Sequence, residues 1–347
     1  MNLKKSYKIL ITLGPSSLNK NFLQFIKKFP VSYLRINMSH INVYNLQKTI
    51  NFIRKYNKKT PICIDTEGAQ IRTKVRKERF LKFGQKIKIT NIKGDINLYP
   101  EFIYKQIKIN DILNIGFHNL KIKIIKNKNN ILCKVLSSGK LENNKGVHIE
   151  NRKIKLNYLT KKDFEAIKIG EKFKIKNYAL SFTNSTDDIM KFNNLLKGKN
   201  KIFKIETLKA IKNFRSILKK GNYFLIDRGD LSRELPIERI PSLQRHIIRE
   251  SKALDTPVYV ATNLLESMIE NMNPTRAEVN DVVSSLLHGA NGLVLAAETA
   301  IGKYPKECVS FVKKCIETRD DFLKFGIKAN KINIDNKIPR LSTKISK

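Results

Sequence analysis

Eight short apolar runs recur along the chain, and helix-length amphipathic segments separate most of them. The runs lie at residues 8–14, 32–39, 61–67, 177–182, 201–206, 223–230, 257–263 and 292–298. Between them, residues 45–56 and 240–254 repeat apolar positions three and four apart, the period of a helix with one buried face. Eight such units are typical of a parallel α/β fold and predict a (β/α)8 TIM barrel. The spacings between the fourth, fifth and sixth runs are short and leave the least room for helices.

A second pattern occupies residues 74–156, between the third and fourth runs. Apolar and polar residues alternate there, and Gly and Asn interrupt them. Period two with turn residues predicts antiparallel strands. We therefore expect a small β-barrel domain, inserted after the third strand as a lid. Residues 1–73 and 157–325 would form the two parts of the TIM barrel, and residues 326–347 a polar, mobile tail.

The chain is strongly basic, with 68 Lys+Arg against 30 Asp+Glu and a formal net charge of +38. Such an excess can indicate a nucleic-acid partner. Here it is spread along the chain, comes mostly from lysine and accompanies abundant asparagine and isoleucine. Compositional drift therefore explains it better than a nucleic-acid-binding patch. In either case the field attracts anionic small molecules.

No apolar run approaches the roughly 20 residues of a membrane span, and the run after the basic N-terminus is too short for a signal peptide. We therefore expect a cytoplasmic protein without a membrane partner. The four cysteines form no Cys-x-x-Cys pair and no metal-binding spacing with the five histidines, which predicts reduced, structural thiols. They are Cys63, Cys133, Cys308 and Cys315.

Polar side chains gather at the carboxyl ends of the apolar runs, where barrel enzymes carry their chemistry. They are Arg35, Asn37, Ser39, Asp65, Thr66, Ser181, Lys204, Glu206, Asp230, Thr262 and Glu298. Singly, each could be half of a salt bridge near a loop. As a set they indicate a ligand site, because buried charges must pair with one another or with ligands.

The residue types in this set are suited to one kind of chemistry. Glu206 and Asp230 offer the hard oxygen ligands that suit Mg²⁺. Arg35 and Lys204 supply the cations that suit a phosphate, Arg35 as a planar fork and Lys204 as a point charge. Two carboxylates for a metal and two cations for a phosphate are what phosphoryl transfer requires.

Several motifs resemble those of the pyruvate kinase family, over about residues 5–320. They are "KILITLGPSS", "LRINMSH", "IDTEGAQIRT", "KGVHI", "KIET", "DRGDLSRELP", "ATNLLESMIENMNPTRAEVNDV" and "AAETAIGKYPKECV". The resemblance implies a phosphotransferase of glycolysis that moves the phosphoryl group of phosphoenolpyruvate to ADP, giving pyruvate and ATP. It implies Mg²⁺ or Mn²⁺ as cofactor.

The resemblance also implies roles for single residues. Glu206 and Asp230 would ligate the divalent ion, and Lys204 would stabilise the phosphoryl group and the enolate. Arg35 and Thr262 would complete the catalytic set. The substrate would contact Arg35, Lys204, Gly229, Asp230 and Thr262. A potassium ion would contact Asn37, Ser39, Asp65 and Thr66. The nucleotide would contact His40, Arg72 and Lys145, the last from the inserted domain as it closes and excludes water.

Six positions depart from the family pattern. They are Glu67 (usually Lys), Ala69 (Pro), Gln70 (Glu), Thr183 (a larger residue), Asp227 (Ala) and Ser232 (Gly). In that family the position of Gln70 is tied to potassium dependence, so the use of K⁺ is left open. Asp227 adds a negative charge where the substrate carboxylate would bind. It could pair with Arg228 or Arg35, point away from the site, or mark a changed substrate.

The family continues into a further α/β domain used for subunit contacts and effectors, whereas this chain stops soon after the eighth helix. The expectation is therefore a short form without family-type effector control, whose oligomer, if any, lacks those contacts. Thr275, Arg276, Glu278 and Glu298 could either buttress the site or contact substrate.

The sequence leaves three candidate functions open. The first is a pyruvate kinase-like phosphotransferase. The second is an enzyme of the same fold that acts on a different phosphoryl donor or enolate in a specialised pathway. The third is a non-catalytic protein that binds a polyanion or belongs to a larger assembly.

Overall fold

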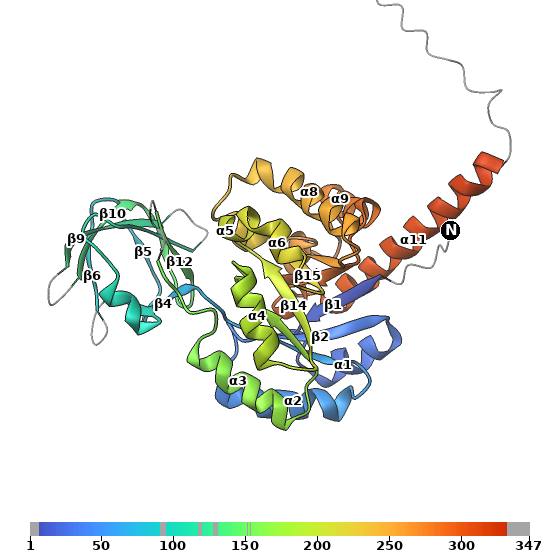
Figure 1. Cartoon of the computed structure of the whole chain (residues 1–347), viewed down its shortest axis with the longest axis horizontal. Coiled ribbons are helices and arrows are strands. Elements are labelled where there is room, and N and C mark those ends of the chain that lie inside the picture. Colours follow the sequence, from blue (N-terminus) through green and yellow to red (C-terminus); the bar gives the residue numbers. More distant parts are fainter. Residues whose placement is uncertain are drawn as a thin grey trace, which may run out of the picture.

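The computed structural model describes residues 7–90, 95–116, 120–127, 131–150, 152 and 154–331, with side chains described as far as residue 318. Figure 1 shows two bodies, a barrel wrapped by helices and a smaller sheet beside it. No helix in the described part of the chain is long and apolar enough to cross a membrane.

Eight parallel strands close into a barrel in the order β1-β17-β16-β15-β14-β13-β3-β2. The strands are β1 (Lys8–Thr12), β2 (Val31–Asn37), β3 (Ile62–Asp65), β13 (Asn177–Leu180), β14 (Asn200–Ile205), β15 (Phe224–Asp227), β16 (Val258–Ala261) and β17 (Gly292–Leu295). Each lies within or overlaps one of the eight apolar runs. The predicted (β/α)8 fold is therefore confirmed.

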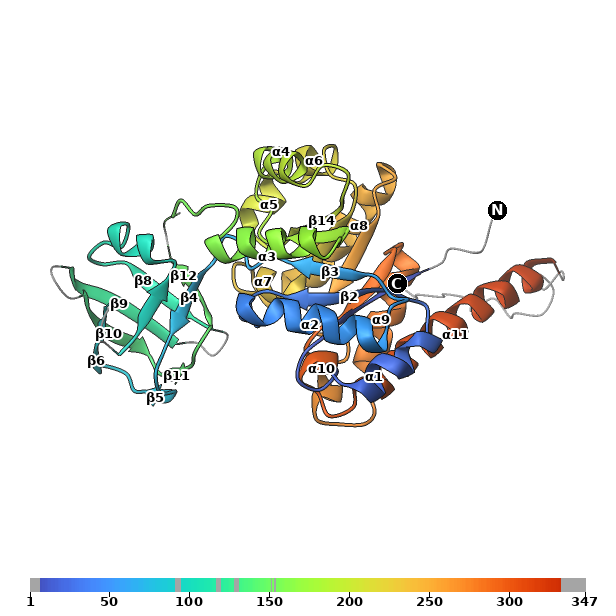
Figure 2. The ribbon, with the colours of Figure 1, turned by 90° about the horizontal axis from the view of Figure 1, so that it is seen from below.

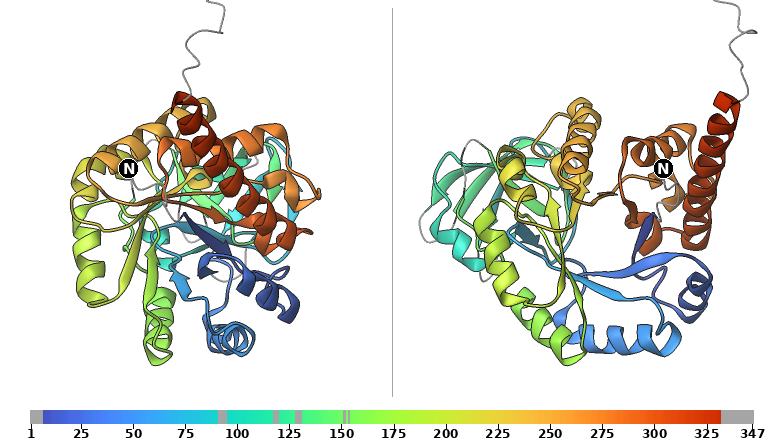
Figure 3. Two further views of the ribbon diagram at one scale, coloured as in Figure 1. Left: turned by 90° about the vertical axis from the view of Figure 1, so that its right-hand side faces the viewer. Right: turned by 45° about the vertical axis from the view of Figure 1, so that its right-hand side comes forward.

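Helices surround this barrel, as Figure 3 shows. They are α1 (Lys20–Phe25), α2 (Val43–Tyr56), α3 (Lys161–Lys172), α4 (Thr186–Leu195), α5 (Leu208–Lys212), α6 (Phe214–Leu218), α7 (Arg228–Leu231), α8 (Ile240–Ala253), α9 (Arg276–His288), α10 (Ala297–Ala300) and α11 (Pro305–Lys331). Leu46, Ile50 and Ile53 of α2 lie on one face and are fully buried against the strands. Between β14 and β15, where the spacing is short, two helices of five residues replace one longer helix.

Side-chain alternation along the strands separates an apolar lower interior from a charged upper interior. Leu10, Cys63, Ala179, Ile202 and Leu225 fill the inside of the barrel with Tyr259, Ala261 and Val294. Successive residues of a strand face opposite sides, so the residue two positions further on also points inward. In this way the rows continue into the polar residues Thr12, Asp65, Ser181, Lys204 and Asp227 at the carboxyl end.

The inserted body is a seven-stranded sheet in the order β6-β10-β9-β8-β12-β4-β7, with a separate β11-β5 pair. Its strands are β4 (Ile71–Lys74), β5 (Arg79–Leu81), β6 (Lys86–Ile89), β7 (Asn97–Tyr99), β8 (Ile112–Ile115), β9 (Leu120–Asn127), β10 (Ile131–Ser137), β11 (Gly139–Leu141) and β12 (Gly146–Ile149). It has a core of its own, made mostly of Ile and Leu. Figure 2 shows β4 leading from the barrel into this sheet.

Two boundaries differ from those expected. The inserted sheet begins at Ile71. The expected border between the barrel and the inserted domain, at 73/74, therefore falls inside β4, whose residues Arg72 and Thr73 already pair with β7. At the C-terminus, α11 continues to Lys331, so residues 326–331 of the expected tail are helical. Val309 and Val312 pack this helix on the barrel, and its far end projects beyond it (Figures 1 and 2). Residues 332–347 of the expected tail lie outside the described residues.

A buried carboxylate joins α3 to the segment between β3 and β4. Asp163 lies in the first turn of α3 and forms a capping box with the N-cap residue Thr160. Its Oδ1 accepts a hydrogen bond from the Glu67 amide at 2.7 Å, and its Oδ2 accepts one from the Gly68 amide at 3.0 Å. Asp163 therefore fixes the chain at the root of the inserted sheet.

Replacing Asp163 by alanine is expected to lower the free energy of unfolding by about 2–4 kcal/mol, because buried amides lose their acceptor. Chemical denaturation followed by circular dichroism measures the change. Asp187→Ala is the matched control, since Asp187 is also a first-turn acid but is exposed on α4. Its effect should stay within about 0.5 kcal/mol, and equal losses in the two variants would contradict the assigned role of Asp163.

Candidate active site

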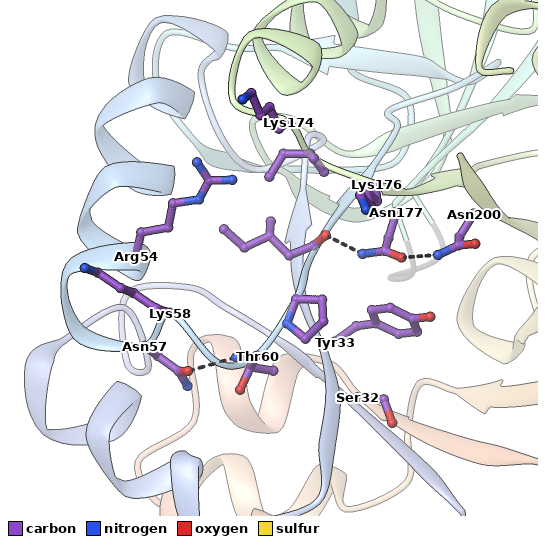
Figure 4. Close-up of a pocket in the computed structure, with 13 residues that line it drawn as sticks. Ser32, Tyr33, Arg54, Asn57, Lys58, Thr60, Lys174, Lys176, Asn177 and Asn200 are labelled. Carbon is purple, nitrogen blue, oxygen red and sulfur yellow. Dashed lines mark hydrogen bonds between the residues drawn. The ribbon is translucent and has the colours of Figure 1, made fainter. Parts of the chain in front are cut away.

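Two hollows lie at opposite ends of the barrel. One, of about 390 Å³, lies at the amino ends of the strands, where Arg54, Lys58, Lys174 and Lys176 are among the lining residues and no carboxylate is (Figure 4). The other, of about 480 Å³, lies between the carboxyl ends of the strands and the inserted sheet. Barrel enzymes carry their chemistry at the carboxyl end, so the second hollow is the candidate site.

A buried ammonium group lies beside Glu206, one of the residues that line this hollow. Lys204 Nζ lies 2.6 Å from Glu206 Oε1 and 3.5 Å from both Asp65 Oδ2 and Asp227 Oδ2. It also donates a hydrogen bond to Ser181 Oγ at 3.1 Å. These five residues are each 5% exposed or less. The charges are therefore satisfied within the protein, as burial requires.

Arg35 forms the second cation of the cluster. Its Nε and Nη2 both contact Asp65 Oδ2, at 2.7 and 2.5 Å, and its Nη1 donates to Thr12 Oγ1 at 2.9 Å. The sequence analysis placed Asp65 among possible potassium ligands. Here its carboxylate lies between the two cations, Arg35 and Lys204, and bridges them.

The other three side chains expected at a potassium ion are also engaged within the chain. Asn37 Oδ1 accepts from the Ser39 amide, and Ser39 Oγ accepts from Arg72 Nη2, both at 3.0 Å. Thr66 Oγ1 accepts from the Ser181 amide at 3.0 Å. A potassium ion would therefore compete with existing donors for these oxygens.

Three carboxylates converge beside the ammonium. Glu206, Asp227 and Asp230 each offer an oxygen, and these oxygens lie within 4.8 Å of one another. Such a hard oxygen set fits a divalent cation such as Mg²⁺ or Mn²⁺. Glu206 and Asp230 were expected from the sequence, whereas Asp227 was recognised only as a departure. Its position two residues after inward-facing Leu225 is the signal that places it inside the barrel.

Burial and mutual repulsion shape the ionisation of this cluster. Burial raises the pKa of Glu206 to about 8, with Lys204 opposing and Asp227 and Asp230 reinforcing the rise. The pKa of Asp230 is also raised, by burial and then by Asp227. For Asp227, burial acts upward, but Lys204 and Arg35 outweigh it and hold its pKa below the ordinary value. The pKa of Lys204 rises because nearby carboxylates outweigh its burial.

Gly229 and Thr262 contact each other at the edge of the site. The Gly229 amide donates to Thr262 Oγ1 at 2.8 Å. Thr262 has φ of +67°, a left-handed conformation that is uncommon for a β-branched residue and that marks functional sites more often than chance. Arg228 holds this turn by donating to the Thr262 carbonyl at 3.0 Å and pairing with Asp281 at 2.5 Å.

The three residues expected to contact a nucleotide lie at the junction of barrel and inserted sheet. Arg72 Nη1 donates to the Asn144 carbonyl at 3.1 Å, and Lys145 follows directly, with its Nζ 3.6 Å from Glu142. His40 is exposed at this mouth. Partial desolvation, with Arg72, Arg35 and Lys145 nearby, lowers its pKa to about 4, so its ring is neutral at pH 7.

The inserted sheet touches the barrel closely at this junction. Asn144 Nδ2 donates to the Ser39 carbonyl at 2.5 Å. A Cβ on Gly146 would fall 1.9 Å from Arg233 Nη1, so the glycine leaves room for the guanidinium in this position. Gln70 Nε2 donates to Asp230 Oδ1 at 3.3 Å. The contacts of Asn144, Gly146 and Arg233 were not predicted, because they join segments far apart in the chain.

Glu278 and Glu298 differ in their contacts. Glu278 forms a capping box with Thr275 and accepts from the Ser267 amide at 2.6 Å, which favours a buttressing role. Glu298 is 1% exposed and accepts from the Ala296 amide at 3.0 Å. Burial raises its pKa.

The structure is a (β/α)8 barrel with an inserted β domain and a buried cluster of cations and carboxylates. It therefore belongs to the class of barrel proteins that carry an ionic site at the carboxyl ends of the strands. The family model of the pyruvate kinase barrel domain matches residues 4–309. The chain belongs to the pyruvate kinase family.

Individual relatives agree with this assignment. Plastidial pyruvate kinase 3 of Arabidopsis thaliana is 34% identical over 326 residues, 88% of this chain and 57% of that protein. Pyruvate kinase isozyme G of Nicotiana tabacum is 34% identical over 328 residues, 89% of this chain and 58% of that protein. The pyruvate kinase of Thermotoga maritima is 33% identical over 337 residues, 92% of this chain and 72% of that protein. The chain thus spans little more than half the length of the two plant relatives.

Glu67, at the root of the inserted sheet, generates a prediction about pH. Its Oε1 lies 3.8 Å from Arg72 and 3.7 Å from Lys162, while its Oε2 is buried without a hydrogen-bond partner among the described residues. Burial raises the pKa of Glu67 despite these cations. The folded protein therefore binds this proton at a higher pH than the unfolded chain, so the contribution of Glu67 to stability falls as the pH rises from about 4.3 through the raised pKa.

Glu67→Gln removes this dependence. The variant should match the wild type near pH 3, below the unfolded pKa of about 4.3, where the carboxyl is protonated in both states, and should be more stable at pH 7. Urea denaturation at the two pH values measures this, with Glu165→Gln on the exposed surface of α3 as control. A variant less stable than the wild type at pH 7 would contradict the prediction.

Proposed function

We propose that this chain is a pyruvate kinase-like phosphotransferase, which transfers the phosphoryl group of phosphoenolpyruvate to ADP. The observation that carries the proposal is the buried cluster of Lys204, Arg35 and Glu206 with Asp230 at its edge, beneath the inserted sheet. Phosphoryl transfer depends on positioning and on positive charge near the transferred group. Membership of the pyruvate kinase family supports the choice of donor and acceptor.

The residues divide the chemistry among them. Glu206 and Asp230 would hold Mg²⁺ or Mn²⁺, which when bound supplies positive charge to the phosphoryl oxygens. Arg35 would hold the phosphate of the donor through its guanidinium fork. Lys204, kept protonated by its carboxylate neighbours, would stabilise the phosphoryl group in transfer and the enolate that remains. Thr262, beside the Gly229 amide, would contact the substrate.

The inserted sheet would contribute the nucleotide contacts and exclude water. Arg72 and Lys145 supply cations where the sheet meets the barrel, and His40 lies at the same mouth. Closure of this sheet over the hollow would protect the phosphoryl group from hydrolysis. A monovalent cation, if used, would bind at Asn37, Ser39, Asp65 and Thr66.

A second candidate is an enzyme of the same fold with a different phosphoryl donor. Asp227 favours it, because this buried carboxylate lies beside the ammonium group that the donor would need.

The test is an assay of purified protein for pyruvate formation that depends on phosphoenolpyruvate, ADP and Mg²⁺, with and without K⁺. Lys204→Arg, which keeps the charge but moves it, should lower kcat/KM by about 10²- to 10⁴-fold. Lys204→Ala leaves three carboxylates without their shared cation and should also lower stability. Lys191→Ala, on the exposed surface of α4, is the matched control.

Circular dichroism must show that Lys204→Arg is folded at the assay temperature. Wild-type turnover that Lys204→Arg leaves unchanged would contradict the role of Lys204. Absence of wild-type turnover with these substrates would contradict the proposed function.

A further inference from the structure

Lysines form a continuous row across three strands of the inserted sheet. Lys134 of β10 pairs with Lys86 of β6 on one side and with Lys123 of β9 on the other. Residues directly opposite each other in an antiparallel sheet point to the same face, with Cβ atoms about 5 Å apart. Lys86 and Lys134 are exposed, and Lys123 is half-buried. The three side chains therefore leave the sheet side by side.

A second row extends the same face. Lys88 of β6 and Lys126 of β9 both pair with Leu132 of β10, which lies between them. On β6 the lysines alternate with buried isoleucines, so the lysines lie on the face away from the core of the sheet. We call the five lysines of the two rows the lysine face; they are Lys86, Lys88, Lys123, Lys126 and Lys134.

The lysine face is not neutralised within the described part of the chain. Strands β6, β9 and β10 contain no Asp or Glu, and none of the five lysines forms an ion pair with a described residue. Two acids of neighbouring segments are already engaged, Asp95 with Arg79 at 2.5 Å and Glu150 with Lys121 at 2.7 Å. Like charges directly opposite each other destabilise a sheet. The strand register thus gathers positive charge at a cost that an anionic partner would offset.

The lysine face is separate from the candidate active site. Strands β4 and β12 lie next to the barrel, whereas β6, β9 and β10 lie on the far side of the inserted body (Figures 1 and 2). None of the five lysines is among the residues that line the hollow at the carboxyl ends of the barrel strands. Whatever binds to the lysine face therefore binds outside the hollow.

Exposed aromatic rings adjoin the lysine rows. Phe83 is 70% exposed and lies three residues before Lys86. Its amide donates to Ser138 Oγ at 2.9 Å, just after the end of β10, which places Phe83 beside the ends of β6 and β10. Phe80 is 63% exposed and pairs with Lys140. Proteins bind single-stranded nucleic acid by this combination, since bases stack on the rings while cations contact the phosphates.

We propose that the lysine face is a binding surface for single-stranded nucleic acid, which it contacts through the phosphate backbone. Successive lysines on β6 are two residues apart, about 7 Å along the strand, so several ammonium groups lie within reach of successive phosphates. Contacts to phosphate carry no base sequence information, and binding is therefore independent of sequence. This surface is additional to the proposed phosphotransferase site and does not depend on it.

The proposal differs from the interpretation of the net charge by compositional drift. Along the chain the excess of lysine is spread out, and composition alone does not reveal a patch. The register of β6, β10 and β9 is what gathers part of the excess on one face. Drift can supply the lysines, whereas their placement opposite one another comes from the fold.

An anionic membrane is the competing partner for a basic surface with exposed phenylalanines. Peripheral proteins bind membranes through a helix whose apolar face enters the lipid. The lysine face is instead a sheet surface, and the residue between the two lysines of its second row is a half-buried leucine, Leu132. It offers charge without a broad apolar area to insert, which favours nucleic acid.

Fluorescence anisotropy of the whole chain with a short labelled single-stranded RNA of mixed sequence tests the proposal. A triple variant replaces one lysine row with glutamines, at Lys86, Lys123 and Lys134. It should bind at least tenfold more weakly than the wild type at about 50 mM salt. Each lost phosphate contact lowers the slope of log affinity against log salt by about 0.7, so the slope should fall by about 2.

The matched control removes the same number of charges from the barrel. It replaces three exposed lysines of α2 and α3 with glutamines, at Lys48, Lys168 and Lys172. Both triple variants have the same net charge, so a diffuse effect of composition weakens them equally. Phe83→Ala should weaken binding about tenfold by removing a stacking ring, with Tyr44→Ala, an exposed ring on α2, as its control. Circular dichroism checks that every variant is folded.

Equal weakening in the two triple variants, or no RNA binding by the wild type, would overturn the proposal. Binding to vesicles of anionic lipid but not to RNA would assign the lysine face to a membrane instead. If duplex RNA binds as tightly as the single strand and Phe83→Ala has no effect, the assignment to single strands is wrong. Because anisotropy needs no turnover, none of these outcomes depends on the pyruvate assay.

Discussion

The ion cluster around Lys204 is the constraint on which the site depends. An ammonium in a barrel interior loses its hydration and is stable only when acceptors replace it. Asp65 of β3, Glu206 directly after β14 and Asp227 of β15 provide that replacement. Since each strand must keep its register for these atoms to meet, the cluster ties the geometry of the site to the pairing of the barrel strands.

The inserted sheet is also held in place by polar contacts. Its root is held by Asp163 through the amides of Glu67 and Gly68, and the loop between β11 and β12 contacts Ser39 through Asn144. Gly146 allows Arg233 of the barrel to lie against the sheet. These contacts place the sheet over the hollow, and they hold it by a few polar groups rather than by a shared apolar core, since the two bodies have separate cores.

The sequence predicts this fold well because its signals are local. Each barrel strand is an apolar run, and the alternation that buries Leu225 also turns Asp227 inward. The contacts that complete the site are not local. Asp163 meets Gly68 across 95 residues, and Asn144 meets Ser39 across 105. No period or motif in either segment indicates such a partner, which is why the site residues could be proposed from sequence but their pairing could not.

Family membership therefore accounts for the fold, whereas individual charges in the site bear on the ligand. The barrel and its inserted sheet follow from a pattern that tolerates many side chains, and this pattern is what the relatives share. The ligand that the site accepts depends on individual charges that the same backbone can carry in different numbers. Position 227 lies in an inward-facing row, so a charge introduced there cannot be neutralised by solvent and must be balanced by Lys204 and Arg35. A single residue at this position thus changes the charge of the buried cluster while the fold stays the same.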